Sequence, residues 1–204
     1  MTRPTLDFWF EFASTYSYLS AMRIERLASE QGVTIRWRPF MLGPIFAAQG
    51  WTSSPFNIYP AKGRHMWRDM EREAATLGLP FRRPDPFPQN GLLAARVALV
   101  GAEEEWCPAF VRGLYEAEFA QGRPIAEPDV VGDVLIALGK DAVAVIARAS
   151  TDDNKAALKA QTEEALRLGL FGAPNFVTPD GEMFWGNDRL DAALDWVSAL
   201  NRVA

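Results

Sequence analysis

The stretch Phe10–Leu19, FEFASTYSYL, decides the fold. The short apolar segment Leu6–Phe12 predicts a strand, and the spacing of apolar residues from Ser17 to Gln31 predicts a helix directly after it. The quartet S-T-Y-S occupies the strand-to-helix turn, a place where redox proteins often carry a Cys-x-x-Cys pair. Both ends of the quartet, Ser14 and Ser17, are serines. Dithiol–disulfide exchange is therefore excluded at this turn, because that reaction requires a thiolate.

Length and composition restrict the possible classes of protein. The chain has 204 residues, which suits one domain with an insertion, and its net charge of -5 argues against a nucleic-acid partner. Its single cysteine, Cys107, cannot form an intramolecular disulfide, and we expect it to be a buried structural thiol. We also expect no secretory signal, no membrane span and a cytoplasmic location, because no apolar run approaches the roughly 20 residues that a span requires.

The order of predicted elements indicates the architecture. A second strand is expected at Val33–Phe40, so the chain begins as a parallel βαβ unit, and Met41–Pro60 is expected to be irregular. Helices are then expected at Arg64–Leu77, Gly91–Glu105, Pro108–Gln121, Pro128–Leu138, Asp141–Ala149 and Asp152–Leu168. The ending APNFVTPDGEMFWG predicts a hairpin, and Asn187 or Asp188 is expected to cap a final helix.

This order predicts an α/β fold with a thioredoxin-like βαβ…ββα sheet and a large all-helical insertion between its halves. The thioredoxin-like part is expected at 1–40 and 170–204, and the insertion at 41–169.

Three stretches are candidates for chemistry. Ser14 either caps the helix or, in addition, donates a hydrogen bond to an anionic sulfur of a ligand, whereas Ser17 is expected to face the core. The Ala173–Pro174 bond is either trans in an edge strand or cis, in which case the backbone of the preceding residue can pair with a peptide-like ligand. The stretch FWGNDRL is either a simple turn or a site with N–H donors for a carboxylate and Asp188 for an ammonium group.

The stretches DFWFEFASTYSYL, PAKGRHMWRD, FPQN and FGAPNFVTPDGEMFWGNDRL resemble the 2-hydroxychromene-2-carboxylate isomerases and the kappa-class glutathione transferases. Both groups belong to the DsbA-like branch of the thioredoxin superfamily. The resemblance covers nearly the whole chain, and its most specific parts are the serine turn and the ending W-G-N-D-R-L.

The resemblance implies a set of site residues. Ser14 matches the serine that contacts the sulfur of glutathione, and Asn90 matches a position in the substrate pocket of the isomerases. The other implied contacts with glutathione are Lys62, Ala173, Pro174, Trp185, Gly186, Asn187 and Asp188. No metal is implied, and one cysteine with one histidine cannot form an ordinary zinc site.

Two positions depart from the pattern of the relatives. Thr15 replaces the proline that many relatives carry in the serine turn, which predicts a slightly looser start of the helix. Ala47 and Ala48 stand where isomerases usually carry a lysine that helps to hold the substrate carboxylate. His65, with the neighbouring arginines, is either a replacement for that lysine or part of a solvated helix face.

The resemblance therefore implies a glutathione-dependent isomerase that acts on an aromatic or conjugated carbonyl substrate, such as a small carboxylate of aromatic catabolism. Catalysis would proceed by reversible addition of the glutathione thiolate, and the relatives imply a homodimer. Two alternatives stay open. One is a kappa-like glutathione transferase or peroxidase that uses the same site, and the other is a non-redox DsbA-like protein that binds peptides.

Overall fold

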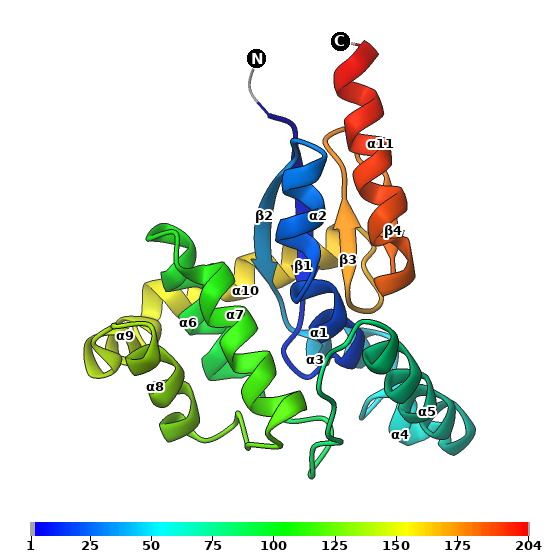
Figure 1. The fold of residues 1–204 in the computed structure, drawn as a ribbon. Helices are drawn as coiled ribbons and strands as arrows, with labels where there is room; N and C mark the ends of the chain where they lie inside the picture. The colour runs from blue at the N-terminus through cyan, green and yellow to red at the C-terminus, as the bar shows by residue number, and fades with distance from the viewer. Residues whose placement is uncertain (1–2, 204) are drawn as a thin grey trace.

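Four short strands form one mixed sheet in the computed structural model, which describes residues 3–203 (Figure 1). The strands are β1 (Thr5–Phe10), β2 (Thr34–Pro39), β3 (Asn175–Val177) and β4 (Met183–Trp185), in the order β2-β1-β3-β4. β1 pairs in parallel with β2 and antiparallel with β3, and β4 pairs antiparallel with β3. This arrangement confirms the predicted thioredoxin-like sheet, in which distant halves of the chain meet.

Helices form most of the remaining described chain. They are α1 (Thr15–Ala21), α2 (Ile24–Glu30), α3 (Leu42–Ala48), α4 (Pro55–Ile58), α5 (Pro60–Thr76), α6 (Leu92–Glu103), α7 (Cys107–Tyr115), α8 (Pro128–Ala137), α9 (Ala142–Ala149), α10 (Asp152–Arg167) and α11 (Leu190–Val203). α2 and α11 cover one face of the sheet and α10 crosses the other face, while α4 and α5 extend away from α6–α9 (Figure 1). Within residues 3–203, every helix is too short or too polar to span a bilayer.

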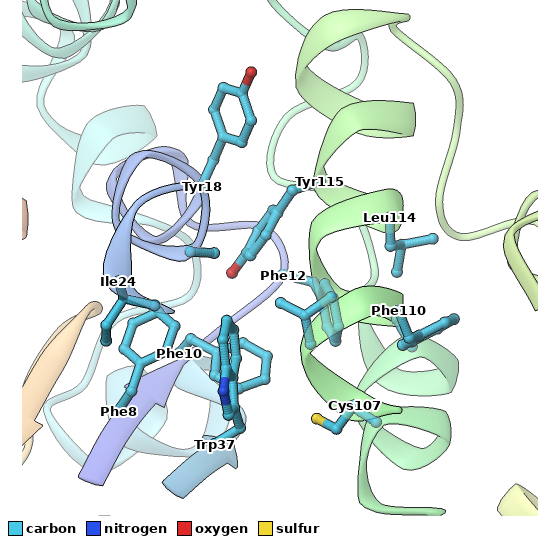
Figure 2. Close-up of a cluster of buried hydrophobic side chains, with 14 of the residues drawn as sticks. Phe8, Phe10, Phe12, Tyr18, Ile24, Trp37, Cys107, Phe110, Leu114 and Tyr115 are labelled. Carbon is cyan, nitrogen blue, oxygen red and sulfur yellow. The ribbon is translucent and has the colours of Figure 1, made fainter. Parts of the chain in front are cut away.

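The alternation of side chains along β1 divides the interior into two cores. Leu6, Phe8 and Phe10 join the main core under α1, α2 and α11, and Trp9 joins a smaller core on the opposite face. Figure 2 shows how the aromatic rings of β1 and Tyr115 of α7 fill the space between sheet and helical region. Because the main core includes residues from both, the division into two domains stays a prediction.

One predicted helix, Ser17–Gln31, is wrong in its continuity, because the structure breaks it into α1 and α2. The N–H of Arg23 bonds to Ser20 three residues back, so the α-helical ladder is interrupted there. The guanidinium of Arg23 instead reaches the carbonyl of Asn187 at 2.8 Å. A tertiary contact with the other half of the chain therefore accompanies a break that helical periodicity does not reveal.

The prediction that Met41–Pro60 is irregular is also wrong, since α3 and α4 lie there and α5 begins at Pro60. The prolines caused the error. Pro44 lies in the first turn of α3 and Pro55 begins α4, where a missing N–H has no cost. Ser54 accepts a hydrogen bond from the N–H of Phe56 and caps α4.

Two predicted helix ends also differ. The helix expected at Pro108–Gln121 changes at Tyr115 into a π-helical segment, η1 (Glu116–Ala120). The last helix is preceded by a 3-10 turn, η2 (Asn187–Arg189), rather than by a side-chain cap from Asn187 or Asp188. Asn187 and Asp188 of η2 line the cavity described below, and irregular helical turns are often found at such places.

Candidate functional site

Ser14 lies at the carboxyl end of β1 and is the N-cap of α1, as predicted. Its N–H donates to the carbonyl of Glu11 at 2.9 Å, and its Oγ accepts a hydrogen bond from the N–H of Ser17 at 3.2 Å. The same hydroxyl donates to the carbonyl of Ala173 at 3.0 Å. The hydroxyl therefore connects the first helix to a loop 159 positions away, whereas Ser17 is fully buried, as expected.

The next two residues attach the turn to α5. The hydroxyl of Thr15, the residue that replaces a proline, is buried and donates to the sulfur of Met66 at 3.2 Å. Tyr16 donates its phenolic hydrogen to Asp69 at 2.9 Å. These two bonds hold the start of α1 in place, so the loss of the proline's conformational restriction is offset by contacts with α5.

The loop before β3 presents its backbone to the same space. The Ala173–Pro174 bond, which the sequence left open, is cis. Within residues 3–203, the N–H of Ala173 has no acceptor, while its carbonyl accepts from Ser14. Gly172 lies against Trp185, whose Nε1 is 2.6 Å from the position of a Cβ at Gly172. A side chain at Gly172 would therefore displace the indole.

The turn after β4 completes this side of the site. Gly186 has a φ of 107°, which favours glycine, and its N–H donates to Pro174 at 3.0 Å. Asn187 is buried, and its Oδ1 accepts from Ser20 at 3.0 Å and from Arg23. The carboxylate of Asp188 is mostly exposed. Asn187 is thus a structural connection to α1 and to Arg23, whereas Asp188 is an exposed carboxylate that lies 3.6 Å from Arg189.

A cavity of about 1110 Å³ brings these segments together. Of the residues predicted from the sequence, it is lined by Ser14, Asn90, Ala173, Trp185, Gly186, Asn187 and Asp188. Pro174 and Lys62 do not line it, and the ammonium of Lys62 lies 4.9 Å from the ring centre of Tyr59. Asn90 uses its Oδ1 to accept from the N–H of Leu92 at 3.0 Å, which leaves its amide nitrogen for a ligand.

The other half of the cavity has residues that sequence reasoning did not find. Its walls are aromatic, with Phe46, Trp51, Phe56 and Phe87 among them. Glu11 and Gln89 also line it, although each is less than a tenth exposed. Two features of the sequence could have indicated these residues. Glu11 interrupts the apolar end of the first strand, and Gln89 directly precedes the predicted site residue Asn90.

Glu11 is the most perturbed ionisable group of the cavity. Burial raises its pKa from 4.5 to about 8, and the N–H of Ala13 opposes this change only in part. Glu118 of η1 is also buried, and its pKa lies well above the ordinary value because of burial and the charge of Glu11. The hydroxyl of Tyr115 donates to the backbone carbonyl of Glu11 at 2.9 Å. At neutral pH the carboxyl of Glu11 therefore holds its proton.

Cys107 is buried in the main core, as predicted, and burial raises the pKa of its thiol to about 12. Within the described part of the chain, histidine, cysteine and carboxylate side chains do not gather in groups of three or more that could hold a metal.

Comparison with known proteins agrees with this geometry. The model of the DsbA-like thioredoxin domain matches residues 5–197. The chain belongs to the DsbA-like thioredoxin family. It is 30% identical over 188 residues to a 2-hydroxychromene-2-carboxylate isomerase of Sphingobium xenophagum, covering 92% of this chain and 94% of that one. It is 28% identical over 213 residues to glutathione S-transferase kappa 2 of Caenorhabditis elegans, covering 96% and 92%.

A solved structure extends the likeness to three dimensions. The structure of a 2-hydroxychromene-2-carboxylate isomerase superposes with a TM-score of 0.84 at 28% identity and covers 98% of this chain and 95% of that one. The resemblance read from the serine turn and from W-G-N-D-R-L is thereby confirmed for this DsbA-like protein. In the family's fold, its turn carries Ser14 and Ser17 in place of a dithiol.

Proposed function

We propose that this DsbA-like protein is a glutathione-dependent isomerase that acts on an aromatic or conjugated carbonyl substrate. One observation carries the proposal. The hydroxyl of Ser14, the free N–H of Ala173 and the carboxylate of Asp188 face one cavity, whose far half has aromatic walls. Its volume, about 1110 Å³, exceeds what one small ligand ordinarily needs. The isomerase and transferase relatives support the same function.

The residues present fit glutathione along its length. The N–H of Ala173 and the neighbouring carbonyl suit a peptide backbone, as an added strand would pair with them. Asp188 suits the ammonium group of the γ-glutamyl end, and the cations Arg23 and Arg189 lie beside the same turn for its carboxylate. Trp185 and Gly186 form the adjoining wall. Lys62, on exposed surface in this structure, is proposed to reach glutathione only by moving its flexible side chain.

Ser14 is the proposed catalytic residue. When bound, glutathione would supply a thiolate that can add reversibly to an electrophilic carbon. The hydroxyl of Ser14 would turn its hydrogen from Ala173 toward the sulfur and stabilise the anion, while its oxygen continues to cap α1 through Ser17. The N–H groups of the first turn of α1 add partial positive charge at the same place. The aromatic far half would exclude water from the reacting atoms, and the amide nitrogen of Asn90 would contact the substrate.

The proposal is tested with Ser14→Ala and with Ser198→Ala as a control far from the cavity. Calorimetry first measures glutathione binding to the wild type, where absence of binding at about millimolar concentration would refute any glutathione enzyme. Turnover of 2-hydroxychromene-2-carboxylate and related enones is then followed by absorbance, with thiol titration of the free glutathione. We expect isomerisation with no net loss of glutathione, a loss of about 100-fold or more in kcat for Ser14→Ala and little change for the control.

A kappa-like transferase or peroxidase is the second candidate, favoured by the match to glutathione S-transferase kappa 2 over nearly the whole chain. Stoichiometric loss of glutathione with product would select it over the isomerase. A peptide-binding protein without enzymatic activity would instead bind peptides and leave glutathione unbound.

We further propose that the protein is a cytoplasmic homodimer. Analytical ultracentrifugation measures the mass in solution, and a sedimenting species of monomer mass at micromolar concentration would contradict the dimer. Fractionation of cells that express the chain tests the location.

A further inference from the structure

The ionisable side chains that line the cavity have one sign. Apart from the phenol of Tyr16 and the carboxyl of Glu11, which holds its proton at neutral pH, they are the acids Asp69, Glu73 and Asp188. No lysine, arginine or histidine of the described chain is among the lining residues. Ala47 lines the wall. Within residues 3–203, the cavity wall thus has no cationic side chain that could hold a substrate carboxylate.

Cations near the cavity lie at its other end or outside it. Arg23 bonds to Asn187, and Arg189 lies 3.6 Å from Asp188, both at the turn proposed for the γ-glutamyl end of glutathione. Arg72 pairs with Asp69 at 3.0 Å but does not line the cavity. His65 and its neighbouring arginines are exposed on α5, which favours the solvated helix face of the two interpretations. An anion that enters the far half therefore meets acidic side chains and aromatic walls, and no cation of the described chain.

Gln89 supplies an unused polar group in this far half. The residue is 6% exposed, and within residues 3–203 neither its Oε1 nor its Nε2 has a hydrogen-bond partner. Two residues further on, the backbone is closely packed, because a Cβ at Gly91 would lie 2.9 Å from Cβ of Phe12 and 3.4 Å from Oε1 of Glu11. Buried amides are nearly always hydrogen-bonded in native proteins, and the unpaired state carries a desolvation cost. An amide that is buried, unpaired and beside a cavity indicates a partner on a ligand.

We propose that this half of the cavity takes an uncharged aromatic or conjugated carbonyl compound and discriminates against carboxylates, with the Gln89 amide donating a hydrogen bond to the carbonyl oxygen. The inference deepens the proposed function, on which it rests for the location of glutathione. A carbonyl oxygen matches the Nε2 donor, the ring of the compound matches the aromatic walls, and the absence of charge avoids the acids. The carboxyl of Glu11 lines the same cavity and, in its protonated form, is a second possible donor to the carbonyl oxygen.

Two enones that differ only in charge test the proposal. Benzylideneacetone is neutral, and benzylidenepyruvate carries a carboxylate in place of the methyl group. Binding of each to the wild-type protein saturated with glutathione is followed by quenching of tryptophan fluorescence, since Trp51 lines the cavity. We expect the neutral ketone to bind at least about tenfold more tightly, which corresponds to about 1.4 kcal/mol. Equal or tighter binding of the keto acid, or no binding of either compound while glutathione binds, would overturn the proposal.

Three variants complete the test. Ala47→Lys adds a cation to the wall and should raise affinity for benzylidenepyruvate about tenfold or more, reversing the preference. Gln89→Leu should weaken binding of the ketone about tenfold, and Gln121→Leu on the exposed turn after η1 should not. The isosteric Gln89→Glu, which places a fourth acid in the far half, replaces Gln89→Leu if the latter unfolds. Unchanged ketone affinity in the Gln89 variant overturns the role of the amide. Failure of the wild type to bind glutathione refutes the proposed function instead, and binding of the enones then reports on the cavity alone.

Discussion

The buried carboxyl of Glu11 makes stability depend on pH in a specific direction. In the folded protein burial raises its pKa from 4.5 to about 8, whereas the unfolded chain exposes it to water. Between these values the folded state holds a proton that the unfolded state has released, so the free energy of unfolding falls as pH rises. Each pH unit of separation corresponds to about 1.4 kcal/mol, so the full separation gives a loss of about 5 kcal/mol. The contribution is intact below pH 4.5 and is lost by about pH 8.

The substitution Glu11→Gln removes the titration and keeps the shape of the side chain. Between pH 5 and pH 8 the wild type should lose about 4 kcal/mol more of its unfolding free energy than the variant does. Glu118 adds a dependence of the same sign in both proteins, since burial also raises its pKa. Urea unfolding at intervals of pH measures both curves, and Glu163→Gln on the exposed face of α10 is the matched control. Parallel curves for wild type and Glu11→Gln would refute the reasoning that this carboxyl is buried and protonated.

Further predictions concern single contacts. Ser14→Ala should lower the free energy of unfolding by only about 1 kcal/mol in urea, the usual cost of losing a cap, and a cost of several kcal/mol would mean that its activity loss reflects unfolding. Leu194→Ala, in the buried stripe of α11, should cost about 2–5 kcal/mol by the same method, and a smaller cost would contradict its burial. Gly172→Ala should shift the indole of Trp185, changing tryptophan fluorescence and weakening glutathione binding, and an unaltered spectrum would contradict the 2.6 Å approach. Cys107 should react with Ellman's reagent at pH 8 only in urea, because its thiol is buried and its pKa is raised to about 12, and rapid reaction in the native protein would contradict this.

The sequence predicted the sheet well because its signals are local. The first strand, expected at Leu6–Phe12 and observed at Thr5–Phe10, follows from a few neighbouring residues, as does the hairpin near Asp180. The helix expected from Ser17 begins two residues earlier, at Thr15. Ser17, Ala21, Ile24 and Ala28, which are spaced as on one face of a helix, are all buried, even though the helix is broken between them. Periodicity therefore identified the face that packs but not the continuity of the backbone.

The far half of the site depended on contacts that a local pattern does not encode. Gln89 lies in a proline-rich loop without periodicity, and it lines the cavity together with Gly91, whose backbone packs closely on Phe12. Glu11 continues an apolar strand, and its charge alone would indicate exposure. Burial by Tyr115 and the π-helical segment, more than 100 positions later, turns it into a neutral acid. The resemblance supplied the residues that are proposed to hold glutathione, because their motif is compact in the sequence. The structure was needed to find the residues of the opposite side of the cavity.

The serine turn is the junction that sets the geometry of the cavity. Ser14 bonds to the loop before β3, and Thr15 bonds to α5, so adjacent hydroxyls connect the two walls between which the cavity opens. A cysteine at position 14 would keep a weak donor at best, because a thiol forms much poorer hydrogen bonds than a hydroxyl. It follows that Ser14 does not merely replace a redox cysteine but adds a hydrogen bond that a cysteine would form only weakly. The hydroxyl donates to the carbonyl of Ala173 in the free protein, and in the proposed reaction the same donor would be placed for the sulfur of glutathione beside that carbonyl.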